Sequence, residues 1–185
     1  MPRVGLSPDG VVDAAITIVD ADGPAALTLA AVAAKAGVAT PSLYKHVRNL
    51  AELRDLVTTR VVEELTERLT AAVMGRSGDD ATRALMRAYR SYVVDHPGRY
   101  AAMNQTSAPD LDPRLAAASQ RLLDVLLAVL RGYGLEGAAL VHAARCLRSS
   151  VHGFAVLEAA GGFGLPADLE ASYDLLIRMV VGGLR

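Results

Sequence analysis

Apolar residues recur along the chain at intervals of three and four, and a convincing strand-like alternation is hard to find. The first such segment places Val11, Val12, Ala15, Ile16 and Val19 at helical spacing. Glycine and proline separate the apolar segments. The pattern predicts an all-α fold of nine helices, with loops at 76–79 and 106–111. The predicted helices span residues 8–22, 29–36, 40–47, 50–74, 80–95, 97–105, 113–132, 136–160 and 168–184.

Residues with capping chemistry stand at several of these boundaries. Ser7, Thr28 and Asn49 each precede a predicted helix, and their side-chain oxygens can accept a backbone N–H from its first turn. Gly37 follows the second predicted helix and is a candidate for the left-handed conformation that ends many helices. We therefore expect these helices to begin and end where the caps stand.

Composition supports a helical globular protein. Of the 185 residues, 52% are hydrophobic and 4% aromatic, and alanine is abundant, which favours helices over sheets. The single cysteine, Cys146, excludes a disulfide scaffold. High apolar content with a net charge of -1 excludes disorder. No apolar segment reaches the roughly 20 residues of a membrane span, and no signal peptide opens the chain, so we expect a cytoplasmic protein.

Residues 28–50 carry the most informative pattern. Two short predicted helices are joined by Gly37-Val38-Ala39, the spacing of a helix-turn-helix motif. The charged residues of the segment are Lys35, Lys45 and Arg48, which give +3, so the rest of the chain sums to -1 - 3 = -4. Ordinary helical bundles also contain short helices with a tight glycine turn and a solvated polar face. The pattern by itself therefore favours DNA binding without excluding a purely structural motif.

The segment from Leu27 to Val47 resembles the DNA-binding domain of TetR-type repressors. Its Ala36-Gly37-Val38 turn and its Leu43-Tyr44-Lys45-His46-Val47 helix are similar to the Ala-Gly-Val turn and the Leu-Tyr-x-His-Val recognition helix of that family. The nine predicted helices also match the family layout. The resemblance implies a helix-turn-helix DNA-binding domain over residues 1–49 and a ligand-binding and dimerisation domain over residues 50–185.

The resemblance also implies which residues contact DNA. The recognition helix would enter the major groove, and neighbouring side chains would contact phosphates. Where the family usually has a lysine at the start of the fourth helix, this chain has Leu50, so Arg48 or the amides of that helix would substitute. The implied DNA-binding residues are Thr28, Thr40, Pro41, Ser42, Tyr44, Lys45, His46 and Arg48.

The C-terminal half contains Val151-His152-Gly153, which resembles the motif of the WHG-type effector domain with valine in the tryptophan position. The resemblance implies a pocket for a small, hydrophobic effector. Methionine, tyrosine and leucine suit such a pocket, but each is also an ordinary core residue. The candidate pocket residues are Met86, Tyr89, Tyr92, Tyr100, Met103, Leu123, Leu126, Leu127, Cys146, Ser149 and His152.

The last two long helices are the candidates for a dimer interface, because the family pairs them with their symmetry mates in a four-helix bundle. Small and aliphatic side chains suit such packing. The candidate interface residues are Ala139, Ala143, Val156, Ala160, Leu175, Leu176, Met179 and Val180.

Catalytic and metal chemistry find little support in the sequence. His142 and Cys146 stand four residues apart, but no third ligand and no orienting acid is recognisable, so we expect no metal site, cofactor or enzymatic activity. We expect a homodimeric transcriptional repressor that binds a palindromic operator and responds to a small effector, without a membrane partner. The alternative is a small helical ligand-binding protein or enzyme without sequence-specific DNA binding.

Overall fold

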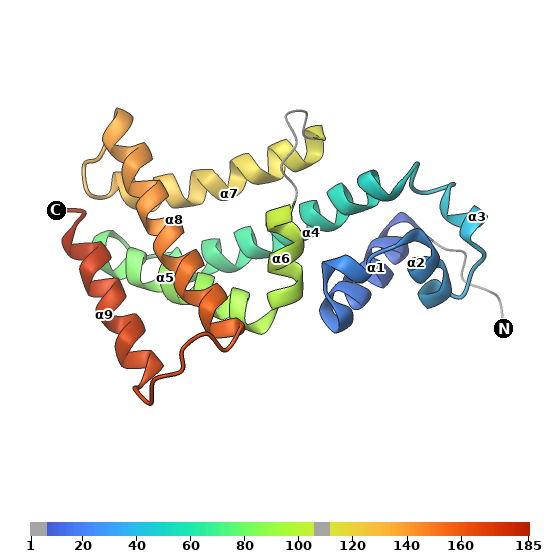
Figure 1. Cartoon of the computed structure of the whole chain (residues 1–185). Coiled ribbons are helices and arrows are strands. Elements are labelled where there is room, and N and C mark those ends of the chain that lie inside the picture. Colours follow the sequence, from blue (N-terminus) through green and yellow to red (C-terminus); the bar gives the residue numbers. More distant parts are fainter. Residues whose placement is uncertain (1–6, 106–111) are drawn as a thin grey trace. The chain divides into compact units, whose positions relative to one another are not determined.

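The computed structural model describes residues 7–105 and 112–185, and its regular elements there are all helical (Figure 1). This confirms the predicted all-α fold. The predicted loop at 106–111 lies outside the described residues. The elements are α1 (Pro8–Asp22), the 3-10 helix η1 (Pro24–Ala26), α2 (Leu29–Ala36), α3 (Thr40–Leu43), α4 (Leu50–Val73), α5 (Gly78–Asp95), α6 (Pro97–Gln105), α7 (Pro113–Arg131), α8 (Gly137–Ala159) and α9 (Leu169–Gly182).

The predicted N-caps are confirmed. The Ser7 hydroxyl accepts a hydrogen bond from the amide of Gly10 at 3.0 Å, and the Thr28 hydroxyl accepts one from the amide of Ala31 at 3.1 Å. The Asn49 side chain accepts one from the amide of Glu52 at 2.9 Å. Each bond satisfies a backbone donor that has no partner within its helix, which is why α1, α2 and α4 begin at these positions.

Two predicted boundaries were wrong. The third helix is not continuous over 40–47, because α3 ends at Leu43 and residues 44–46 form a turn. The amides of His46 and Val47 both donate to the carbonyl of Leu43, at 2.8 and 2.9 Å, so the regular helical ladder stops there. The predicted loop at 76–79 is shorter than expected, because α5 already begins at Gly78.

The backbone divides into two compact units. Unit 1 holds the described residues up to Val62 together with those of 96–119, and unit 2 holds 63–95 and 120–185. Helices α4 and α7 each contribute residues to both units. The boundary at residue 49 that the TetR resemblance implies concerns DNA binding, and it stays a prediction.

Unit 1 is built around α1, which contacts α2, η1 and α6. Its core includes Val11, Ala15, Val19, Val32, Leu43, Val47, Leu53, Val57 and Tyr100, which are fully or almost fully buried. Ion pairs hold the edges of this core. The Arg99 guanidinium of α6 forms an ion pair with the Asp20 carboxylate of α1, with Nη2 2.7 Å from Oδ2. The Arg60 guanidinium of α4 reaches both Asp9 and Asp13, at 3.2 and 3.1 Å.

Unit 2 is built around α5, which contacts α8 and α9, and these two helices also contact each other. Its core includes Leu65, Leu69, Leu85, Met86, Tyr89, Leu130, Leu147, Val151, Tyr173 and Ile177. The hydroxyl of Tyr173 donates to the carbonyl of Met86 at 2.6 Å and so ties α9 to α5. Within the described ranges, we find no helix with the length and hydropathy of a transmembrane segment.

Candidate nucleic-acid interface

Helices α2 and α3 form a helix-turn-helix held by a defined helix ending. Gly37 has φ 67° and ψ 31°, the left-handed conformation that glycine adopts without steric cost. The amide of Val38 donates to the carbonyl of Ala33 at 3.0 Å, and the amide of Gly37 donates to that of Ala34 at 3.2 Å. This pair of bonds is the Schellman motif, which turns the chain sharply into α3.

The residues after this turn divide between core and solvent. Leu43 and Val47 are buried, as the helical spacing predicts, and they anchor α3 in unit 1. Tyr44 is 57% exposed, and Pro41 and Lys45 are also exposed. Hydroxyl and ammonium groups on such an exposed turn can donate to phosphate oxygens and to base edges.

The remaining DNA-binding candidates lie around this turn. Thr28 is exposed and caps α2, while Thr40, Ser42 and His46 are half-buried. The Arg48 side chain is 79% exposed. All eight candidates therefore belong to unit 1, within or beside the helix-turn-helix. Their contacts with DNA stay predictions.

The start of α4 is already occupied by an internal network. Glu52 accepts a hydrogen bond from the backbone amide of Arg48 at 2.5 Å, and its carboxylate lies 3.1 Å from Nε of the Arg48 guanidinium. These two hydrogen bonds hold the pKa of Glu52 below its usual value, and the carboxylate raises the pKa of Arg48. Leu50, in the position of the family lysine, is half-buried.

A second carboxylate on the same helix has the opposite shift. Burial raises the pKa of Asp55, and the negative charges of Asp112 and Glu52 raise it further. Acidic groups therefore flank the basic helix-turn-helix at the start of α4 and of α7.

The predicted pocket residues divide between the two units. Tyr100 and Met103 lie in the core of unit 1, whereas Met86, Tyr89, Tyr92 and Leu126 are buried in unit 2. Of the others, Leu127 and His152 are half-buried, and Leu123, Cys146 and Ser149 are exposed. Their role in ligand binding stays a prediction.

Two hollows of about 330 Å³ each lie within unit 2. The apolar hollow lies among the end of α4, the start of α5 and α7, and none of the predicted pocket residues lines it. Its lining residues are Thr70, Val73, Arg76, Ser77, Gly78, Ala81, Val125, Ala128, Val129 and Gly132. The charged hollow is lined by Arg87, Arg90, Ser91, Val94, Asp95, Glu158 and Glu170.

No group of three or more His, Cys, Asp or Glu among the described residues is placed to hold a metal ion.

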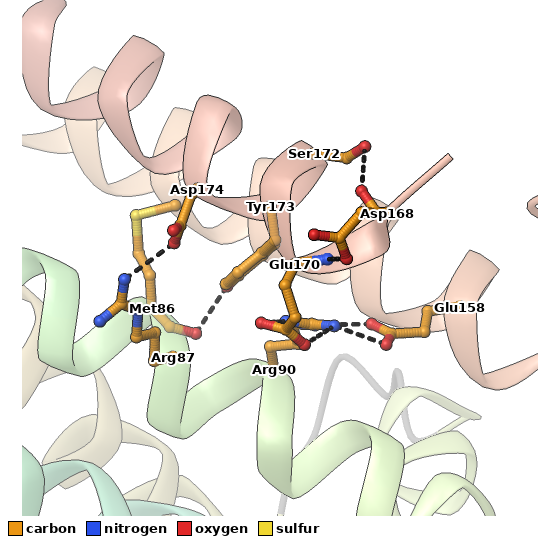
Figure 2. A network of polar contacts seen from close by, with 9 residues as sticks. All are labelled: Met86, Arg87, Arg90, Glu158, Asp168, Glu170, Ser172, Tyr173 and Asp174. Carbon is orange, nitrogen blue, oxygen red and sulfur yellow. Dashed lines mark hydrogen bonds and ion pairs between the residues drawn. The ribbon is translucent and has the colours of Figure 1, made fainter. Parts of the chain in front are cut away.

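Arg90 is the centre of a polar cluster that joins α5, α8 and α9 (Figure 2). Its Nε and Nη2 donate to the two carboxylate oxygens of Glu158, both at 2.6 Å, and its Nη1 donates to Glu170 at 2.8 Å. The guanidinium also lies 4.6 Å from the ring centre of Tyr173, within range of a cation–π contact. The carboxylates raise the pKa of Arg90, so it stays charged despite its burial.

The predicted dimer face is partly exposed on unit 2. Leu175 and Met179 of α9 are 51% and 66% exposed, and Val156 of α8 is also exposed. Ala139 and Ala160 are exposed as well, while Ala143, Leu176 and Val180 are half-buried. A chain without a partner would leave these apolar side chains in water.

Two family models match the chain. One, described as bacterial regulatory proteins of the tetR family, matches residues 11–55, and the other, described as a tetracyclin repressor-like C-terminal domain, matches residues 82–180. The second match alone covers more than half of the 185 residues. The chain belongs to the TetR family. It is therefore a transcriptional regulator with a helix-turn-helix DNA-binding domain, as the resemblance implied.

Two curated relatives match this TetR-family chain over almost its whole length. It is 37% identical over 178 residues to the uncharacterized HTH-type transcriptional regulator Rv0681 of Mycobacterium tuberculosis, a match that covers 96% of this chain and 81% of that protein. It is 35% identical over 186 residues to the uncharacterized HTH-type transcriptional regulator YobS of Bacillus subtilis, covering 99% and 95%.

A solved structure supports the fold. The crystal structure of a possible TetR family transcriptional regulator from Streptomyces coelicolor A3(2) has a TM-score of 0.74 to this chain, at 20% identity. The similarity covers 97% of this chain and 98% of that one. Over the part of the chain that the structure describes, the predicted nine-helix TetR architecture is therefore confirmed, while the WHG subtype of the C-terminal domain stays a prediction.

The Arg90 cluster was missed by the sequence reasoning on this TetR-family chain. The sequence feature that could have revealed the cluster is an arginine within the apolar stripe of α5, where Met86, Tyr89 and Val93 are all buried. An arginine at such a position needs carboxylate partners, because an unpaired buried charge is strongly unfavourable. The sequence alone does not say which of the chain's acids reach it.

Proposed function

We propose that this TetR-family regulator binds a palindromic operator as a homodimer and represses transcription. The observation that carries the proposal is the helix-turn-helix itself, in which buried Leu43 and Val47 anchor a turn that exposes Tyr44 and Lys45. Residues 1–49 form the DNA-binding domain in this proposal. Thr28 sets the N-terminus of α2 against a phosphate, and Arg48 contacts a phosphate in place of the family lysine. Tyr44 and His46 contact the backbone or adjacent bases. The residues that enter the major groove are Thr40, Pro41, Ser42 and Lys45.

The homodimer is supported by the exposed apolar residues of α8 and α9. A single helix-turn-helix makes few contacts, and two-fold pairing places two recognition helices about one turn of DNA apart, which explains a palindromic operator. In this arrangement Val156, Leu175 and Met179 pack against the same residues of a second copy, because a two-fold interface is self-complementary.

Residues 50–185 bind the effector in this proposal, and the effector is small and hydrophobic. The apolar hollow supports it, because aliphatic walls with a few polar groups are typical of ligand pockets. A ligand shifts the equilibrium between DNA-binding and released states only by its differential affinity for them. As a DNA-binding regulator, the protein acts in the cytoplasm.

The direct test is selection of bound fragments from genomic DNA, followed by titration of the enriched sequences at several salt concentrations. We expect palindromic sites to be enriched. The affinity should fall with salt at a log-log slope of about -0.9 for each neutralised phosphate. Enrichment of no sequence would support the alternative of a helical ligand-binding protein or enzyme without sequence-specific DNA binding.

Substitutions in the recognition turn separate two kinds of contact. Lys45→Ala should weaken binding to every sequence, because an ammonium in the major groove is attracted by the phosphates on both sides of the groove whatever the bases are. Changes at Ser42 or Pro41 should alter which sequence is preferred, because these residues would lie against base edges. Titration of each variant on several operators measures both effects. Unchanged affinity in both Tyr44→Ala and Lys45→Ala would refute the proposed interface.

A further inference from the structure

We propose that Glu52 restrains the affinity for DNA by occupying the two groups at the start of α4 that would otherwise attract a phosphate. These groups are the guanidinium of Arg48 and the positive end of the helix. The inference rests on the proposed DNA-binding function and goes beyond it, because it states that an acidic residue limits how tightly the protein binds DNA.

Glu52 contacts Arg48 in two ways, through the backbone amide and through the guanidinium. One carboxylate oxygen, Oε2, accepts the backbone amide of Arg48 at 2.5 Å and lies 3.1 Å from its Nε. The Arg48 side chain is 79% exposed and follows the exposed Lys45 by three residues. The ion pair of guanidinium and carboxylate has no net charge, although the guanidinium itself stays charged, so a phosphate that binds Arg48 must compete with Glu52.

The helix end is occupied in the same way. Exposed backbone amides and the helix dipole make the N-terminus of a long helix attractive to anions. In α4 the amide of Glu52 already bonds to the Asn49 side chain, and the Glu52 carboxylate supplies the negative charge that the dipole favours. A phosphate approaching this point would meet a carboxylate of like charge.

The negative charge of Glu52 is large relative to the small positive charge of the helix-turn-helix segment. Residues 28–50 hold three basic residues and no acid, and Glu52 is the next charged residue after Arg48. Its pairing reduces the local charge from +3 to +2. Leu50 offers no replacement, because it lies between Arg48 and Glu52 without a charge of its own.

The charge of Glu52 can be removed without removing its hydrogen bond. Glutamine also serves in the position that reaches back to the amide before a helix. Glu52→Gln therefore keeps an acceptor for the Arg48 amide and releases the Arg48 guanidinium. The matched control is Glu67→Gln, an exposed glutamate of the same helix, which changes the net charge of the chain equally.

The experiment titrates the full-length protein and both variants against a short random-sequence duplex and against a selected operator, and it compares their melting temperatures. We expect Glu52→Gln to bind both duplexes about 3- to 10-fold more tightly at low salt. The log-log salt dependence should steepen by about 0.9 for each copy bound. Equal affinities for Glu52→Gln and Glu67→Gln would overturn the inference.

A double-mutant cycle assigns the gain to Arg48. In the natural background, Arg48→Ala should lower the affinity by less than it does in the Glu52→Gln background, because Glu52 competes with phosphate for that guanidinium, and in the Glu52→Gln background it should remove most of the gain. An equal loss in both backgrounds would contradict the restraint. If the unmodified protein binds neither duplex, the proposed function fails too, which distinguishes that outcome from failure of the inference alone.

Discussion

At the scale of single residues, Gly98 shows how closely two helices approach in unit 1. It lies in the first turn of α6, where a Cβ atom would overlap the carbonyl oxygen of Val19 in α1. The obstacle is backbone, which cannot rotate away as a side chain can. The neighbouring Arg99–Asp20 ion pair holds the same two helices together. Glycine at 98 is therefore required by packing.

Gly98→Ala should accordingly destabilise the protein. Forcing a methyl group against the Val19 carbonyl requires α6 to move away from α1, and overpacking of this kind costs about 1–3 kcal/mol. Denaturant unfolding followed by circular dichroism measures the change. Gly153→Ala is the control, because a Cβ there meets no atom within 4 Å and alanine favours the helix by about 0.5–1 kcal/mol. Equal stability of the two variants would contradict the argument.

At the scale of elements, local signals predicted the helices well and long-range partners poorly. Ser7, Thr28, Asn49 and Gly37 act on atoms within five residues of themselves, so sequence alone located them. The early end of α3 was not predicted. There the amides of His46 and Val47 share the carbonyl of Leu43, and the spacing of apolar residues carries no information about that hydrogen-bond pattern.

Side chains far apart in the sequence were harder to place. Arg90 and Glu158 are 68 residues apart, and no periodicity connects them. The candidate pocket residues were chosen as adaptable apolar side chains, a property that core residues share. The structure accordingly buries six of them, and it places Tyr100 and Met103 in unit 1.

Arg90 should be the main polar link between α5 and the pair α8 and α9. In Arg90→Met the methionine can fill the space, but the Glu158 carboxylate, whose side chain is 15% exposed, loses its bidentate partner. Removing one partner of a buried pair leaves an uncompensated charge, so we expect a loss of about 2–4 kcal/mol. Thermal and denaturant unfolding give the value.

Arg90→Lys serves as the control for charge alone. Lysine keeps the positive charge but has no planar fork for Glu158, so its stability should fall between those of the wild type and of Arg90→Met. In the double variant Arg90→Met/Glu158→Gln, much of the loss should be recovered. An Arg90→Met protein as stable as the wild type would show that the cluster contributes nothing to holding the three helices.

At the scale of the whole molecule, the net charge of -1 hides a separation of charge. Residues 28–50 sum to +3, and the remaining residues therefore to -4. A homodimer would present the basic segment twice to one operator and so double its electrostatic attraction for DNA. If the protein binds its operator as the proposed homodimer, a substitution that prevents dimerisation should also weaken binding to the operator.

Met179→Glu tests that link. Met179 is 66% exposed on α9, so glutamate there costs an isolated chain little. In a two-fold interface, however, each copy would bring the charge to the shared surface, where burial of an unpaired carboxylate opposes association. Analytical ultracentrifugation should show monomers at concentrations where the wild type is dimeric, and affinity for a palindromic duplex should fall to that for a single half-site. Met74→Glu, at a methionine that is 74% exposed just after α4, should leave both unchanged. A Met179→Glu dimer that binds the palindrome normally would place the interface elsewhere.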